Sequence, residues 1–348
     1  VCIAKQMGIQ EESLQDLAVC ALLHDNALTQ YIQEELHNDI SQIAVTQEVP
    51  KLGAHCIWGE KNVAELPFHT DVSDVIENAD GSGPFGKKWD EIPLFSRIIH
   101  LCDLLDIACR TKKFAEGTWK VAEQFVQNST GTMFDRECRD AFLRAFSEEQ
   151  FLSLDRETFE DQLWKMVPRI KQDLDFSQIK ALAVFFARIV DYKSPFTSTH
   201  SIGVAEDAEK LSRHMGFDEE TVQKMYLAGA LHDIGKVAIG NEILEKPGKL
   251  TDEEFKAMKH HAAYTYYILS DIDDFEEIRD WAAFHHERMD GTGYPFGRSA
   301  AELNTQESRP YKQGMTHEKA SGILWDMAKK GWIDGDIVRE VDSCFAAI

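Results

Sequence analysis

Two stretches far apart in this chain carry closely similar sequences. AKQMGIQEESLQDLAVCALLHD, residues 4–25, aligns without a gap with SRHMGFDEETVQKMYLAGALHD, residues 212–233. The similarity continues downstream, where NADGSGPFG, residues 78–86, parallels RMDGTGYPFG, residues 288–297. Because the matching segments follow the same order in both halves, the repeat predicts two copies of one domain.

The second copy has the periodicity of an α-helix just before its His-Asp pair. Small and apolar residues recur there at i, i+3, i+4, i+7 and i+8, which predicts one buried helix face ending near His232-Asp233. They are Val222, Met225, Tyr226, Gly229 and Ala230.

A second helix start is marked by Thr251 and Glu254, which match a capping box. The helix that they open carries His261, and we expect it to place three apolar residues on one side: Phe255, Met258 and Ala262. No segment shows convincing strand alternation. The expected fold class is therefore all-α, with two tandem helical bundles.

The repeat also predicts the division of the chain. Residues 1–145 hold the first copy and residues 179–348 the second. Residues 146–178 are charged and helix-prone with a break at Pro168, so we expect a helical connector rather than a flexible linker.

Composition narrows the class of protein. The formal net charge of −23 argues against binding DNA or RNA, because a polyanion needs a cationic surface. Seven cysteines without a CxxC pair are typical of the reducing cytoplasm. The longest apolar run, residues 181–190, contains Arg188 and is too short to cross a bilayer. Since the chain begins with Val1 instead of Met, we expect a fragment of a longer protein.

The second copy contains an ordered series of metal-binding residue types. Imidazole and carboxylate without thiolate suit iron, manganese or zinc, and so many groups exceed the needs of one tetrahedral ion. Two metals sharing a site are therefore expected. The series is His200, His232, Asp233, His261, His285 and His286, with Lys236 following the His-Asp pair.

These residues lie within motifs that resemble the HD-GYP family of cyclic-dinucleotide phosphodiesterases. The motifs are HDIGK (232–236), KPGKLTDEEF (246–255), MKHH (258–261), HHERMDGTGYP (285–295) and RPYK (309–312). The resemblance covers about residues 185 to 345 and implies HD-domain-like bundles with a centre of two or three metals. Phe196 occupies the position of a Glu found in the three-metal members, which favours two.

The resemblance implies a role for each residue of these motifs. His200, His232, Asp233, His261, His285 and His286 would be metal ligands, with iron or manganese first and zinc, magnesium, nickel or cobalt as other candidates. Asp233 and Lys236 would be catalytic, and a metal-bridging hydroxide would attack phosphorus. Substrate would be bound by Lys236, Arg288, Gly293, Tyr294, Pro295, Arg309 and Lys312.

The family pattern is interrupted between Asn304 and Thr305. A helix carrying a further Asp ligand is expected there, and the first copy keeps it in SRIIHLCDLLD with Asp103. Either this ligand has been lost, or the sequence lacks roughly 14 residues at this point, judged from the first copy. We favour the second explanation, because deletion would remove a core helix.

The first copy departs further from the family. It keeps His24, Asp25, His55 and Asp103, but Leu28 replaces the lysine of HDIGK. The paired histidines align with Val75 and Ile76, and Gly-Tyr-Pro has become Gly83-Pro84-Phe85. We therefore expect a catalytically inactive copy that serves packing, dimerisation or regulation of the second.

The substrate is expected to be a cyclic dinucleotide. Most of the family is associated with cyclic di-GMP. A smaller group, with an inactive first copy fused to an active one, resembles this chain closely and is linked to 3′,3′-cyclic GMP-AMP. We therefore favour 3′,3′-cyclic GMP-AMP as the substrate. The product would be a linear 5′-phosphorylated dinucleotide. Cyclic di-GMP as substrate, and a non-hydrolytic receptor for a cyclic dinucleotide, remain the alternatives.

Overall fold

The computed structural model describes residues 1–34, 54–79, 87–109, 117–154, 158–193, 200–303 and 317–345. Within these ranges the chain is helical and contains no strand, so the predicted all-α class is confirmed. It divides into two compact units, Val1–Leu174 and Asp175–Ile348. The predicted connector, residues 146–178, spans this boundary. No helix in the described ranges is long and apolar enough to cross a membrane.

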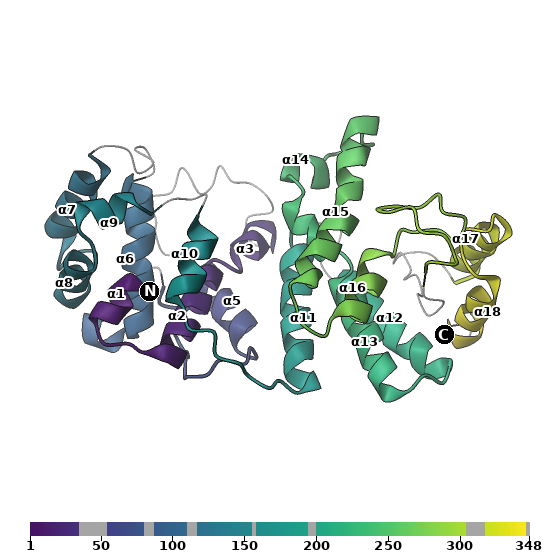
Figure 1. Ribbon diagram of the computed structural model, residues 1–348, viewed down its shortest axis with the longest axis horizontal. Helices are drawn as coiled ribbons and strands as arrows, with labels where there is room; N and C mark the ends of the chain where they lie inside the picture. The colour runs from purple at the N-terminus through teal and green to yellow at the C-terminus, as the bar shows by residue number, and fades with distance from the viewer. Residues whose placement is uncertain are drawn as a thin grey trace. The chain divides into compact units, whose positions relative to one another are not determined.

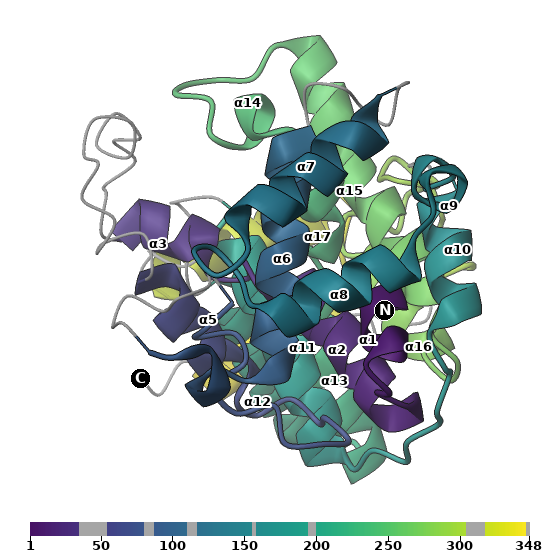
Figure 2. The ribbon, with the colours of Figure 1, turned by 90° about the vertical axis from the view of Figure 1, so that its left-hand side faces the viewer.

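The first unit is built around α6, which contacts α2, α7 and α8 (Figures 1 and 2). Its last helix, α10, is tied to α1, because Lys5 Nζ donates to the carbonyl of Met166 at 2.8 Å. The helices are α1 (Cys2–Gln6), α2 (Glu11–Leu23), α3 (Leu28–Glu34), α5 (Ala54–Val63), the 3₁₀ helix η2 (Trp89–Glu91), α6 (Leu94–Cys109), α7 (Thr118–Ser129), α8 (Arg136–Ala145), α9 (Glu148–Leu152) and α10 (Phe159–Met166).

The second unit is built around α13, which contacts α11, α12 and α16 (Figure 1). Its helices are α11 (Phe176–Asp191), α12 (His200–His214), α13 (Glu219–Leu231), the 3₁₀ helix η3 (Ile234–Ala238), α14 (Asn241–Leu244), α15 (Asp252–Ser270), α16 (Glu276–Ala283), α17 (His317–Lys329) and α18 (Gly335–Phe345).

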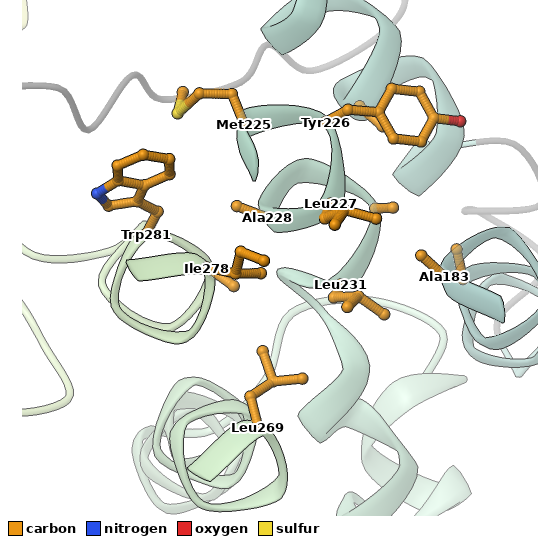
Figure 3. Packing of buried hydrophobic residues seen from close by; sticks show 13 residues of the cluster. Ala183, Met225, Tyr226, Leu227, Ala228, Leu231, Leu269, Ile278 and Trp281 are labelled. Atoms are coloured by element: carbon orange, nitrogen blue, oxygen red, sulfur yellow. The ribbon is translucent and has the colours of Figure 1, made fainter. Parts of the chain in front are cut away.

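The core of the second unit surrounds α13 on more than one face. The predicted stripe is buried, but Leu227, Ala228 and Leu231 outside it are buried as well. Figure 3 shows the cause: Ile278 of α16 approaches α13 from one side and Ala183 of α11 from the other. A helix covered on several sides needs apolar residues around most of its circumference.

Side-chain caps set where the helices of the second unit begin. Thr251 Oγ1 accepts a hydrogen bond from the Glu254 amide, and Glu254 accepts one from the Thr251 amide at 2.7 Å, so the predicted capping box is confirmed. Of the three apolar residues expected on one side of this helix, Phe255 is 49% exposed. It lies only one turn into the helix, whereas the part of α15 that lies against η3 includes His261 and Thr265.

The repeat is visible in the backbone of the two units. α2 and α13 start and end at aligned positions, and each follows a glycine with positive φ, Gly8 at 80° and Gly216 at 77°. Ile9 N donates to the carbonyl of Ala4, and Phe217 N donates to that of Ser212, both at 3.1 Å. The same helix-ending turn therefore precedes the His-Asp helix in both units.

Gly229 allows α12 and α13 to approach closely, since a Cβ at this position would lie 2.8 Å from Ala205 Cα. We predict that Gly229→Ala lowers the free energy of unfolding by about 1–3 kcal/mol, because backbone would have to move. Gly322 in α17 has open space where a Cβ would lie, so Gly322→Ala should raise the free energy of unfolding by about 0.5–1 kcal/mol. Urea denaturation measures both, and a stabilising Gly229→Ala would contradict the packing.

Candidate metal centre

The predicted metal-binding residues come from four segments of the second unit. His200 is the first residue of α12, and His232 caps the end of α13 directly before Asp233. His261 lies in the middle of α15, while His285 and His286 follow the end of α16. The packing of these helices therefore brings together residues that are far apart in the sequence.

Three of the histidines are oriented by the same local device. In each, Nδ1 donates to the carbonyl three residues earlier at 2.7 Å: His232 to Gly229, His261 to Met258 and His285 to Ala282. A carbonyl can only accept, so Nδ1 carries a hydrogen and Nε2 is the ring nitrogen that faces the cluster. Outer hydrogen bonds of this kind fix the ring of a metal-ligating histidine.

The Asp233 carboxylate lies at the centre of the cluster and is 4% exposed. Its Oδ2 is 3.0 Å from His232 Nε2 and 2.6 Å from Lys236 Nζ. Its Oδ1 is 3.4 Å from His261 Nε2 and 4.0 Å from His285 Nε2. Each carboxylate oxygen therefore faces a different set of nitrogens.

Two groups of potential ligands result from this arrangement. His200, His232 and Asp233 form one, and His261, His285 and His286 form the other, with the ligand atoms of each group within 4.8 Å of one another. Nitrogen and carboxylate oxygen donors in this combination suit iron, manganese or zinc. The residues present fit two divalent ions.

Burial and neighbouring charge set the protonation of the cluster. Burial alone raises the pKa of Asp233, but the charges of His232 and Lys236 outweigh it and hold this pKa well below its usual value. Burial lowers the pKa of His261, and burial with the adjacent His286 holds that of His285 well below its usual value. An ionised aspartate and neutral imidazoles are the forms that bind metal.

His232 differs from these two histidines. Burial lowers the pKa of its imidazole, but the adjacent Asp233 carboxylate outweighs burial and raises it. A metal ion would take over the role of the proton between these two side chains.

Thr265 is a buried residue that the sequence pattern did not single out. Its hydroxyl donates to the carbonyl of His232 and accepts from the amide of Gly235, both at 3.0 Å. It thereby fastens the HDIGK turn to α15. Gly235 is needed in this turn because a Cβ would collide with the backbone carbonyl of His261.

Asp191, at the end of α11, was also missed by sequence reasoning. Its carboxylate is 1% exposed and accepts from Ser201 N at 2.9 Å and from Ser201 Oγ at 2.7 Å. Since Ser201 follows His200, this contact fixes the first turn of α12. Burial raises the pKa of the Asp191 carboxyl.

The Gly-Tyr-Pro loop lies against the histidines. The Tyr294 ring stacks on His286 with 4.6 Å between centroids and 28° between planes. Gly293 is required because a Cβ would collide with the backbone of Glu287 and Arg288. The peptide bond between Tyr294 and Pro295 is cis.

Arg288 was predicted to bind substrate, and the structure places its guanidinium 3.8 Å from the ring centroid of Trp332. Its Nη1 also donates to Thr292 Oγ1 at 3.3 Å. Asp290 accepts from the amide and hydroxyl of the same Thr292. These contacts tie the loop to residues near the start of α18.

The first unit repeats part of the cluster. His24 Nδ1 donates to the carbonyl of Ala21 at 2.8 Å, as His232 does to Gly229. Asp25 lies between two histidines, with Oδ2 3.4 Å from His24 Nε2 and Oδ1 3.3 Å from His55 Nε2. A hydrogen bond with His55 is the main reason that the pKa of Asp25 is lowered.

The aligned positions of the paired histidines are apolar in the first unit. Val75 is 3% exposed and Ile76 is fully buried. No set of three potential ligands comes together among the described residues of this unit. Gly83-Pro84-Phe85 lies outside those residues.

Several predicted features of the second copy also fall outside the described residues. They are the phosphate-contacting Arg309 and Lys312, and the junction of Asn304 with Thr305 where the further Asp ligand was expected.

Glu287 is the most deeply buried charged residue of the loop, and no sequence motif identifies it because its partners are backbone amides. It is 0% exposed. Its two carboxylate oxygens accept from the amides of Phe296 at 2.7 Å, Gly297 at 3.0 Å and Arg298 at 3.0 Å. It anchors the end of the Gly-Tyr-Pro loop.

We predict that Glu287→Gln lowers the free energy of unfolding by about 1.5–3 kcal/mol, because an amide cannot accept at both positions and loses the charge. Hydrogen exchange of the Phe296 and Gly297 amides should become faster. Glu302→Gln, which alters a carboxylate that caps Ser299 at the surface, is the matched control and should have little effect. Unchanged amide protection in Glu287→Gln would show that the carboxylate does not hold the loop.

The chain is similar in sequence and in fold to proteins of known function. Residues 184–307 match the family model of the HD domain. A 3′3′-cGAMP-specific phosphodiesterase of Vibrio cholerae serotype O1 is 32% identical over 315 residues, which cover 84% of this chain and 65% of that protein. The chain thus spans slightly less than two thirds of that relative's length.

Two further proteins are similar over different shares of the chain. A cyclic di-GMP phosphodiesterase of Pseudomonas aeruginosa is 35% identical over 148 residues, covering 42% of this chain and 35% of that protein. The crystal structure of a cyclic GMP-AMP-specific phosphodiesterase of V. cholerae, V-cGAP3, matches with a TM-score of 0.62 and 23% identity, over 99% of this chain and 90% of that one. This last likeness concerns the fold.

The predicted resemblance to the HD-GYP family is confirmed by these similarities, and the HD-domain family is known for divalent metal binding. Residues 184–307 match the HD-domain family, and the chain as a whole is closely similar to the 3′3′-cGAMP-specific phosphodiesterases of V. cholerae.

Proposed function

We propose that the chain is a metal-dependent phosphodiesterase that hydrolyses a cyclic dinucleotide to a linear 5′-phosphorylated dinucleotide. The observation that carries this proposal is the buried Asp233 carboxylate, whose two oxygens face two separate groups of histidine nitrogens. A carboxylate shared in this way suits a pair of divalent ions, iron or manganese before the other candidates.

Each group of ligands would hold one ion. His200 and His232 would bind the first, His261, His285 and His286 the second, and Asp233 would contact both. Two bound ions supply an activated water and offset negative charge on the phosphoryl oxygens. The chain's own task is to present neutral Nε2 atoms at fixed positions, which the three Nδ1 hydrogen bonds achieve.

Lys236 is the chain's own cation beside the reacting phosphate. Its Nζ is 2.6 Å from Asp233 Oδ2 and its side chain is 21% exposed, so it lies at the boundary between the ligands and solvent. A phosphate oxygen placed there would receive a hydrogen bond from the ammonium. Arg309 and Lys312 are proposed to contact the phosphates, in line with the sequence motif.

The loop after the paired histidines would form one wall of the substrate site. Tyr294 stacks on His286, and Gly293 and Pro295 set the course of the backbone on either side of it. Arg288 stabilises this loop through Trp332 and Thr292, and we propose that it acts on substrate through the loop.

We favour 3′,3′-cyclic GMP-AMP as the substrate. The relative named for this messenger matches 84% of the chain, whereas the cyclic di-GMP phosphodiesterase matches 42%, about the length of one unit. The first unit lacks the paired histidines. We propose that it serves packing, dimerisation or regulation of the active unit. We propose that the protein acts in the cytoplasm, where free cysteines stay reduced.

The proposal predicts hydrolysis of a cyclic dinucleotide by manganese-loaded protein. Product chromatography with 3′,3′-cyclic GMP-AMP and cyclic di-GMP in separate reactions should show the linear product, faster from the first. His286→Ala and Asp233→Asn should each lower kcat by at least about 100-fold, because a ligand rather than its outer partner is lost.

His260→Ala is the matched control, because His260 is the exposed neighbour of His261 and should be dispensable. Intact substrate after incubation with the wild-type protein would refute the enzyme and leave the non-hydrolytic receptor. Full activity of either ligand variant would refute the assignment of the metal centre.

A further inference from the structure

Lys259 lies at the edge of the proposed site and has no role in it so far. It is on α15, two residues before His261. Its Nζ is 5.2 Å from the centroid of the Tyr294 ring and 4.9 Å from that of Phe255. Since Tyr294 stacks on His286, the ammonium is separated from a metal-ligand candidate by a single ring contact.

The Lys259 ammonium lies against two aromatic rings. Among the described residues its ammonium contacts aromatic rings and makes no ion pair, although the chain has 60 acidic residues against 37 basic ones. Two lysines nearby differ in this respect: Lys236 is paired with Asp233, and Lys246 with Glu254. Contacts with ring faces hold an ammonium in place while it can still donate to an anion.

Phe255 adds an apolar surface next to this cation. This residue is 49% exposed. An exposed ring beside an ammonium offers a nucleotide two interactions, stacking for the base and a charged hydrogen bond for the phosphate.

We propose that Lys259 is a further substrate-binding residue, whose ammonium holds the phosphate that is not being cleaved. A cyclic dinucleotide carries two phosphates, and the one under attack is placed at the metal centre beside Lys236. Lys259 contacts Tyr294 and Phe255 rather than the ligands, which suits the second phosphate, with the adjoining base against Phe255. The inference rests on the proposed function, because it names a contact within the same site.

The test compares three variants of the full chain. Lys259→Ala should raise KM for 3′,3′-cyclic GMP-AMP about 10- to 100-fold, the range for a hydrogen bond to a charged group, with kcat and bound manganese little changed. Lys259→Arg should restore most of the affinity, because it keeps a cation at this position. Lys256→Ala removes an exposed lysine one turn earlier on α15 and should behave like the wild type.

Titration calorimetry measures the equilibrium binding of the same dinucleotide to metal-free protein, which gives a readout independent of turnover. Weaker binding by Lys259→Ala and recovery in Lys259→Arg would support the contact. Equal KM and equal affinity in Lys259→Ala and wild type would overturn it while leaving the phosphodiesterase intact. Wild-type protein that neither binds nor cleaves a cyclic dinucleotide would instead refute the proposed function itself.

Discussion

The second unit depends on one buried carboxylate. Taking Asp233 out of water is unfavourable unless its charge is compensated, and the surrounding imidazoles and Lys236 provide that compensation. Those partners come from α13, η3 and α15, so the carboxylate can be satisfied only when these helices are in place. Thr265 and Gly235 serve the same end, since they let the HDIGK turn lie directly on α15. The packing of these helices and the positions of the metal-binding residues therefore depend on each other.

The first unit shows which part of this arrangement the fold requires. It keeps a His-Asp pair at the end of the equivalent helix and a histidine on the other side of the carboxylate. Its turn is held by a different residue, because Asn26 Nδ2 donates to the carbonyls of Leu23 and Gly59. Buried Val75 and Ile76 stand where the second unit has paired histidines. The first unit thus forms around a single His-Asp-His contact, with apolar residues in place of the paired histidines.

Much of the fold and most of the site could be predicted from the sequence. The repeat, the capping box of Thr251 and Glu254, and the ordered histidines are local patterns with a direct physical meaning. Features that depend on tertiary packing could not be predicted in the same way: α13 is covered on several sides, and Phe255 near the start of α15 is exposed. The spacing of apolar residues along a helix does not show how many neighbouring helices cover it or how far along it they extend.

The residues that sequence reasoning missed share one property. Glu287, Asp191 and Thr265 act on backbone groups distant in the sequence, and no spacing rule marks such partners. A buried carboxylate can be suspected when an acidic residue interrupts an apolar or ligand-rich segment, as Glu287 does after His286. For Arg288 the sequence suggested a contact that the structure does not show. Its place beside the ligands in the sequence predicted substrate binding, whereas its guanidinium lies over the ring of Trp332.

We propose that Asp233 is shared by two metal ions. Anomalous diffraction at the manganese edge, from crystals of manganese-loaded protein, tests it most directly. We expect two anomalous peaks about 3.5–4 Å apart with Asp233 between them. One peak should lie beside His200 and His232, and the other beside His261, His285 and His286. A single peak, or peaks away from Asp233, would contradict it.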